Sequence, residues 1–282
     1  MTPDEIQALR PELHRYCARL MGSIVDGEDI VQEALTRALA IPAGGGDMSR
    51  PLLFKIAHNA AIDALRRHER RFADGDDALD AVAADDEAVD PAIVHVALAV
   101  FQRLPVAQRS AVILKDVLGC TLEEIVESTG LTLLAVKAAL VRGRATLRAH
   151  ADDRSAASVA APPDPAERAR LHAYAARFNA RDWDGLRTLL ADETRLELVA
   201  RAERRGKAVG EYFARYAALP DLRAVPGLLD GRPALAVYSP PEAPSPGSFV
   251  LLAWDGDRIT LIRDFRYAEY AMECAATSFV PD

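Results

Sequence analysis

Cysteine is scarce in this sequence, with three residues among 282, at Cys17, Cys120 and Cys274. Three distant thiols match neither a disulfide framework nor a zinc site, so we expect buried, unreactive thiols and no metal or other cofactor. No apolar run reaches the roughly 20 residues that a membrane span requires. The N-terminus also lacks a signal-peptide pattern. We therefore expect a cytoplasmic protein without a membrane partner.

Bases are absent from one short segment of the chain. Eight acids and no Lys or Arg occur between Asp74 and Asp90, and aromatic residues are few there. The rest of the chain has 34 acidic and 34 basic residues, so the formal net charge of −8 comes from this segment alone. Such a composition is typical of a flexible acidic linker, and the bulk charge does not exclude nucleic-acid binding elsewhere.

The chain is long enough for two or three domains. Helical patterns fill the first half, apart from a break at IPAGGGDMSRP, whose glycines and prolines cannot continue a helix. An Ala/Ser/Pro tether follows, and the pattern then changes to short strands. We predict a helical domain at 1–72, the acidic linker at 73–90, a second helical domain at 91–149, the tether at 150–165 and an α+β domain at 166–282.

The α+β domain begins with two predicted helices separated by a loop at Asp182–Asp184. Asp255-Gly256 separates the last two strand-like runs and indicates a hairpin, because glycine accepts the positive φ that a tight turn requires. Helices packed on an antiparallel sheet are the expected architecture. The strand-like runs are TRLELVA, PALAVYS, SFVLLAW and RITLIRDF.

Residues 121–148 read as two helices joined by a turn. Gly130 supplies the turn, and Thr132 is a suitable N-cap for the second helix. This pattern predicts a helix-turn-helix, although an ordinary helical hairpin remains the alternative. Its packing side comprises Leu122, Ile125 and Val126 in the first helix and Val136, Leu140, Gly143 and Leu147 in the second.

The second helix of this pair is cationic. Lys137, Arg144 and Arg148 fall within about 40° of one another at about 100° per residue. No acid occurs between Lys137 and Arg148. Such a face can meet phosphates without repulsion, so these bases are candidate DNA contacts; a merely solvated basic face is the alternative.

A second candidate DNA surface lies on LLFKIAHNAAIDALRRHERR. One side of this helix is apolar, and six bases accompany only two acids between Arg50 and Phe72. Arginine and asparagine together provide backbone neutralisation and base-edge hydrogen bonding, and the carboxylate in the row supports its neighbours. The outer row is Asn59, Asp63, Arg66 and Arg70, with Arg67 and Arg71 at its margins.

The helix predicted for DGEDIVQEALTRALA has an acidic outer stripe. Asp29, Gln32 and Glu33 lie on it, opposite an apolar side. A docking face for a basic partner is the functional interpretation, and an ordinary solvated surface is the alternative.

These motifs, together with LPVAQRSAVILKDVLGCTLEEI and VKAALVRGRATL, resemble an extracytoplasmic-function (ECF) sigma factor over residues 1–149. The resemblance implies two all-α domains, sigma region 2 and a region 4 helix-turn-helix. It implies core RNA polymerase and promoter DNA as partners, with promoter recognition, DNA melting and transcription initiation as the function and no catalysis. The acidic linker would then pass through the polymerase's basic RNA path.

The resemblance also assigns roles to residues. Ala138 and Ala139 stand where the family often has Ser-Arg, so the promoter sequence is not inherited from the resemblance. By position, Asp29, Gln32 and Glu33 would face the polymerase clamp; Asn59, Asp63, Arg66, Arg67 and Arg70 would lie near the melted element; and Thr132, Lys137, Arg142 and Arg144 would lie in the upstream major groove.

Residues 166–278 resemble the cone-shaped, SnoaL-like α+β fold, chiefly in FNARDWDGLRTLLADETRLEL and IRDFRY. The resemblance implies a fused regulatory domain, and a small-molecule ligand in this domain is a further candidate partner. Two other functions stay open: a DNA-binding regulator that never engages polymerase, and a helix-turn-helix fused to a small-molecule enzyme or ligand sensor. The candidate polar groups of the cone are Tyr174, His172, Tyr212, Tyr216 and Asp264.

Overall fold

The computed structural model divides into two compact units, Met1–Ala157 and Ser158–Asp282. It describes residues 1–41, 48–69, 90, 93, 98–150, 164–205, 209–219, 221–275 and 279–281. Among these residues no helix combines the length and apolar character that crossing a membrane requires. A helical unit followed by a sheet-rich unit confirms the predicted order of fold classes.

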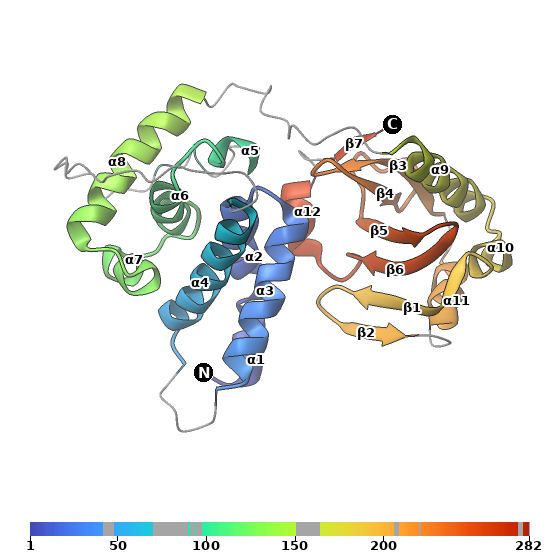
Figure 1. Ribbon diagram of the computed structural model, residues 1–282, viewed down its shortest axis with the longest axis horizontal. Coiled ribbons are helices and arrows are strands. Elements are labelled where there is room, and N and C mark those ends of the chain that lie inside the picture. Colours follow the sequence, from blue (N-terminus) through green and yellow to red (C-terminus); the bar gives the residue numbers. More distant parts are fainter. Residues whose placement is uncertain are drawn as a thin grey trace. The chain divides into compact units, whose positions relative to one another are not determined.

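The first unit is built from helices (Figure 1). Most of the acidic linker, residues 73–89, lies outside the described residues. The helices are α1 (Pro3–Ala8), α2 (Arg10–Met21), α3 (Ile24–Leu39), α4 (Arg50–Glu69), α5 (Leu98–Phe101), α6 (Val106–Val112), a π-helical turn η2 (Ile113–Val117), α7 (Leu122–Thr129) and α8 (Leu133–His150).

The two predicted helical domains share one interior. The Tyr16 hydroxyl of α2 lies 2.7 Å from Nδ1 of His58 in α4, and the Ser110 hydroxyl of α6 lies 3.5 Å from the same nitrogen. The buried Arg109 guanidinium donates to the carbonyl oxygen of Leu20 at 2.6 Å, near the end of α2. Apolar residues from α1 to α8 form a single buried cluster. The described helices of the first unit therefore share one buried core.

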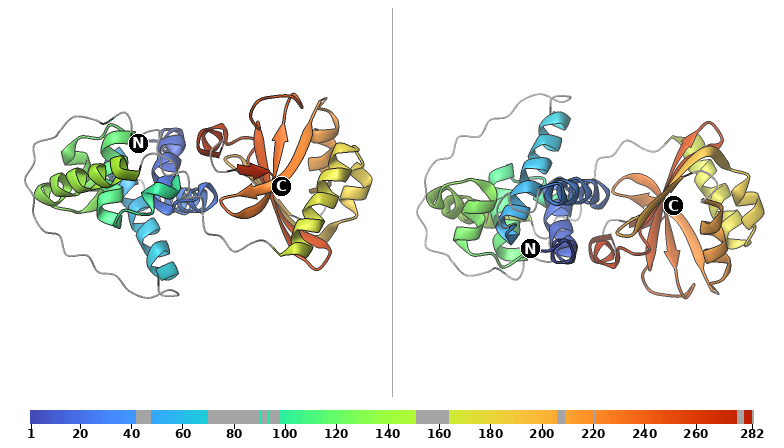
Figure 2. Two further views of the ribbon diagram at one scale, coloured as in Figure 1. Left: turned by 90° about the horizontal axis from the view of Figure 1, so that it is seen from above. Right: turned by 90° about the horizontal axis from the view of Figure 1, so that it is seen from below.

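The second unit contains a seven-stranded sheet in the order β2-β1-β6-β5-β4-β3-β7. Helices α9, α10 and α11 lie on one face of it (Figure 2). The elements are α9 (Pro165–Asn179), α10 (Trp183–Arg187), β1 (Leu190–Leu198), β2 (Ala202–Arg205), α11 (Gly210–Ala217), β3 (Arg223–Leu229), β4 (Arg232–Tyr238), β5 (Ser248–Asp255), β6 (Arg258–Asp264), α12 (Glu269–Ala275) and β7 (Phe279–Pro281).

The predicted hairpin at Asp255-Gly256 is confirmed, since Asp255 pairs with Arg258 and Gly256 has φ +55°. The predicted antiparallel sheet is wrong in one place, because β1 and β6 pair in parallel. These strands are distant in sequence, and a helix and several strands intervene between them. A parallel pair requires such a crossover, and local patterning does not reveal it.

The buried histidines of the first unit predict acid sensitivity. Burial lowers the pKa of His14 and of His58 to about 4, against an ordinary value of 6.5. Between these values the unfolded chain binds protons that the folded chain does not, so stability falls as the pH drops from 6.5 toward 4. A shift of this size corresponds to about 3 kcal/mol for each histidine.

His58→Gln keeps a hydrogen-bonding group beside Tyr16 but does not titrate. In urea unfolding followed between pH 7 and 4, we expect the variant to lose about half of the wild-type slope. An unchanged slope in the variant would contradict this assignment.

Candidate nucleic-acid interface

The acidic stripe on α3 faces outward. The helix begins after Ser23, whose hydroxyl accepts a hydrogen bond from Asp26 N at 3.1 Å. Asp29 and Gln32 are exposed, and Glu33 is partly exposed and ion-paired with Arg37 on the next turn. The opposite side of the helix is buried, including Ile30, Val31, Ala34, Leu35 and Ala38. The stripe therefore lies at the surface, as the spacing predicted.

The outer row of α4 also faces outward. Ser49 caps the start of the helix by accepting from Leu52 N at 3.2 Å. Arg67 Nε donates to the backbone carbonyl of Asp63 at 3.1 Å. Arg70 and Arg71 lie outside the described residues. The predicted row members Asn59, Asp63, Arg66 and Arg67 are exposed, whereas Leu53, Phe54, Ala57 and Ala61 are buried on the other side.

The helix-turn-helix forms where the sequence places it. Thr121 and Glu124 cap α7 reciprocally, and Gly130 ends that helix at φ +75°. Thr132 caps α8 by accepting from Ala135 N at 3.2 Å, as predicted. At Gly143 a Cβ atom would lie 2.7 Å from a methyl group of Val112, so glycine permits the close approach of α8 to α6. The predicted packing stripe of α8 is buried.

The prediction that Arg144 contacts DNA is wrong. Its side chain is 2% exposed, and it forms a two-pronged ion pair with Asp116 of η2. Arg144 Nη2 lies 2.6 Å from Asp116 Oδ1, and Nε lies 2.9 Å from Oδ2. Burial of a charge requires such a partner, and the pair holds the Arg144 guanidinium away from the surface.

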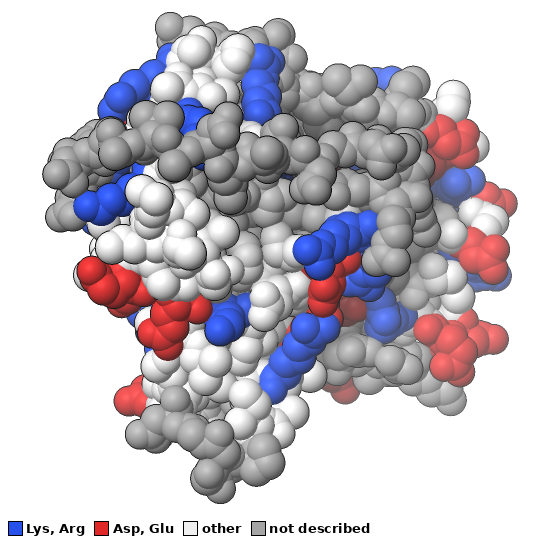
Figure 3. All heavy atoms as spheres, turned by 60° about the vertical axis from the view of Figure 1, so that its left-hand side comes forward, with Lys and Arg blue, Asp and Glu red and all other residues white. Residues whose placement is uncertain are grey.

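The cationic face of α8 is thereby largely neutralised within its own unit. Arg148 is 60% exposed but ion-paired with Asp90 at 2.8 Å, and Asp90 N donates to the Asp116 carboxylate at 3.0 Å. On the described part of the surface in Figure 3, Lys and Arg side chains lie in separate places rather than in one continuous patch. Thr132 is exposed, and Lys137 and Arg142 are partly exposed.

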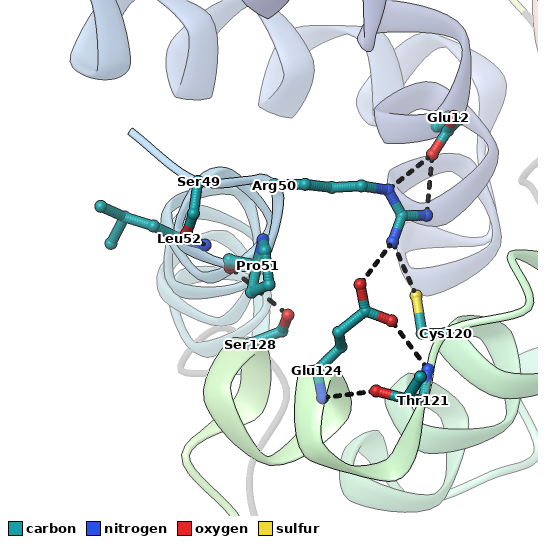
Figure 4. A network of polar contacts seen from close by, with 9 residues as sticks. All are labelled: Glu12, Ser49, Arg50, Pro51, Leu52, Cys120, Thr121, Glu124 and Ser128. Atoms are coloured by element: carbon teal, nitrogen blue, oxygen red, sulfur yellow. Dashed lines mark hydrogen bonds and ion pairs between the residues drawn. The ribbon is translucent and has the colours of Figure 1, made fainter. Parts of the chain in front are cut away.

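Arg50 was not singled out by the sequence, yet it joins several elements (Figure 4). Its guanidinium donates twice to Glu12 of α2, at 3.0 and 2.8 Å, and once to the Cys120 sulfur at 3.3 Å. Glu124, in the first turn of α7, lies 3.5 Å away. Ser128 of α7 donates to the carbonyl oxygen of Pro51. The start of α4 is therefore tied to α7 of the helix-turn-helix.

In the second unit, a buried carboxyl group lies among tyrosines. Tyr216 donates to Asp264 at 2.8 Å, and Arg266 N donates to its other oxygen at 2.9 Å. Burial raises the pKa of Asp264 above its ordinary value. The buried Tyr212 hydroxyl finds no well-aligned partner among the described residues, although its ring packs 5.1 Å from that of Tyr216. Of the candidate polar groups, His172 is exposed and does not join this cluster.

The buried ion pair predicts a contrast between two neighbouring arginines. Arg144→Ala leaves Asp116 buried without its partner, which costs about 3–5 kcal/mol. Arg148→Ala removes an exposed pair and costs less than about 1 kcal/mol. Urea unfolding of both variants measures the difference. Equal losses would show that the Arg144 pair does not anchor α8.

Family models match both halves of the first unit. The Sigma-70 region 2 model matches residues 6–71, and the Sigma-70 region 4 model matches residues 96–147. The first matched segment contains α4, and the second contains α7 and α8 up to residue 147.

Curated relatives extend the match into the second unit. The ECF RNA polymerase sigma factor SigG of Mycobacterium tuberculosis is 30% identical over 270 residues, covering 81% of this chain and 71% of that protein. SigJ of the same organism is 30% identical over 200 residues, covering 67% and 62%. A SigJ crystal structure aligns over 95% of this chain and 99% of that one, with 21% identity and a TM-score of 0.36, which does not establish a shared arrangement. The SigG match, together with the region 2 and region 4 models, shows that this chain belongs to the ECF RNA polymerase sigma factors.

Proposed function

We propose that this chain binds core RNA polymerase and directs it to promoters, where it helps to melt the DNA. The observation that carries the proposal is the exposure of two unlike surfaces within the segment that matches Sigma-70 region 2. An acidic stripe lies on α3, and a row of Asn and Arg side chains lies on α4. The two surfaces differ in charge and therefore suit different partners.

The stripe of Asp29, Gln32 and Glu33 is the polymerase-binding surface in this proposal. The carboxylates are held on a helix whose other side is buried in the core of the unit, so the surface is rigid. A basic clamp surface is its complement. Because exposed ion pairs are screened by salt, this contact provides orientation and association rate rather than most of the affinity.

The row on α4 is the surface for opened promoter DNA. Arg66 and Arg67 supply positive charge, while the Asn59 amide can both donate to and accept from a base edge. Because Arg144 is buried, the upstream-element candidates that precede it in the helix-turn-helix are Thr132, Lys137 and Arg142. The exposed Arg148 completes that set at its far end.

The second unit is, in this proposal, a SnoaL-like regulatory domain. Its helices on one face of a curved mixed sheet, with aromatic residues filling the space between, support that fold. Tyr174, Phe178 and Leu186 are buried there. The polar group around Asp264 is where a small-molecule ligand would find hydrogen-bonding partners. We assign the domain control over polymerase binding or promoter opening rather than catalysis.

Transcription with purified components tests the proposal. Core RNA polymerase with this protein should initiate at specific promoters, which core polymerase alone does not do. Glu33→Lys should weaken association with core polymerase, because it reverses charge on the docking stripe. Arg66→Ala, which leaves the helix-turn-helix unchanged, should instead reduce promoter opening. The permanganate reactivity of unpaired thymines measures that opening. A Glu33→Lys protein that competes for core polymerase as well as wild type would overturn the docking assignment.

The regulatory role is tested in the same assay with a chain that ends at residue 157, the limit of the first unit. Removing a regulatory domain should change the transcript yield at equal protein concentration. Asp264→Asn in the full chain keeps the second unit and removes only its buried carboxyl group, so it tests whether that group contributes to regulation. Unchanged output from the truncated chain would argue that the second unit does not regulate initiation.

A further inference from the structure

Two leucines at the start of α8 are exposed. Leu133 is 46% exposed and Leu134 is 54% exposed, and they are adjacent in the first turn of the helix. Elsewhere on α8 the large apolar side chains Val136, Leu140 and Leu147 are buried against the unit's core. Each of the two leucines therefore leaves a large part of its apolar side chain at the surface.

Polar groups are few on the same part of the helix. The Thr132 side-chain oxygen already accepts the capping hydrogen bond from Ala135 N. Ala138 and Ala139 are buried, and Val141, one turn further on, is apolar and partly exposed. Lys137 is the polar side chain that the first two turns present. The first two turns of α8 therefore offer few groups that could form hydrogen bonds with base edges.

From these observations we infer that Leu133 and Leu134 read thymine methyl groups in the major groove of the upstream promoter element. The inference rests on the proposed function, because it requires promoter DNA as the partner. The N-terminal residues of the second helix in a helix-turn-helix contact base edges. The C5-methyl group of thymine is the apolar group that a base pair presents in that groove, so it is the natural contact for an exposed leucine.

The charge of α8 itself agrees with DNA as the occupant. Helix α8 carries no Asp or Glu over its length, from Leu133 to His150. Lys137 lies one turn from both leucines, where its ammonium group can meet a phosphate or a guanine edge. The N-terminal end of the helix adds a partial positive charge on the side that enters the groove. The two leucines would thus contact apolar groups of the bases, while Lys137 and the helix N-terminus attract the phosphates beside them.

The specificity that follows differs from that of an arginine reader. An arginine pairs two donors with guanine, whereas a leucine gains only by removing apolar surface from water. Removal of one methyl group should weaken binding about fourfold, the equivalent of one buried methylene group. The upstream element should contain at least one thymine whose replacement lowers binding affinity chiefly through the loss of its methyl group.

The experiment uses holoenzyme assembled from core polymerase and the full chain. A duplex library with a randomised upstream element is selected for binding, and each thymine of the selected element is then replaced by deoxyuridine, which lacks only the methyl group. Wild type should lose about fourfold in affinity at one or two positions. Leu133→Ala with Leu134→Ala should bind the thymine duplex more weakly and be indifferent to deoxyuridine at those positions.

Leu219→Ala provides a matched control, because Leu219 is an exposed leucine of the second unit, 38% exposed. This variant should keep the full deoxyuridine effect. The leucine variants should stay folded, since both side chains are exposed and alanine favours a helix; circular dichroism checks this.

Three outcomes overturn the inference. Wild-type binding that is indifferent to deoxyuridine at every thymine would show that no methyl group is read. Leucine variants that lose core polymerase while keeping the deoxyuridine effect would show that the pair docks on protein. Selection of no sequence by wild-type holoenzyme would overturn the proposed function, and the inference with it.

Discussion

The buried pair between Arg144 and Asp116 sets which side of α8 reaches the surface. A charge at 2% exposure is tolerated only with a well-aligned partner, and the two-pronged geometry fixes both the position and the rotation of the helix. Gly143 allows the close approach to α6 beside it. With that side turned inward, the first turn of α8 presents Leu133 and Leu134 instead of a row of bases.

The shared interior of the first unit has a similar effect on α3 and α4. Tyr16, His58 and Ser110 meet where α2, α4 and α6 converge, and Arg50 holds the start of α4 against α7. These contacts commit one side of each helix to the core. The acidic stripe of α3 and the Asn/Arg row of α4 are left at the surface.

The faces of α3, α4 and α7 were predictable, because residues three and four apart share a helix face and no distant information is needed. The caps at Thr132 and Gly130 were predictable for the same local reason. Arg144 was misjudged because its partner Asp116 lies 28 residues away in a π-helical turn, and nothing near either residue indicates the pair. The contacts of Arg50 and the exposure of Leu133 and Leu134 were not predicted either, since distant parts of the fold decide both.

In the sheet, too, the features set by local sequence were predictable and those set by distant pairing were not. Strands β4, β5 and β6 carry alternating or continuous apolar runs that local patterning detects. Strand β3 was missed because Pro226 and Gly227 interrupt its run, although both residues pair with β4 in the structure. The parallel pairing of β1 with β6 depends on chain topology, which the composition of neither strand encodes.

On the proposed function, the outer face of α4 and the first turn of α8 contact two different stretches of one promoter. Photo-crosslinking tests it most directly, with a photoreactive residue in place of Arg67 or of Leu134 in polymerase-bound protein. Position 67 should crosslink to DNA near the melted start region, and position 134 should crosslink to the duplex upstream of it. Crosslinks from both positions to polymerase alone, or to the same stretch of DNA, would contradict it.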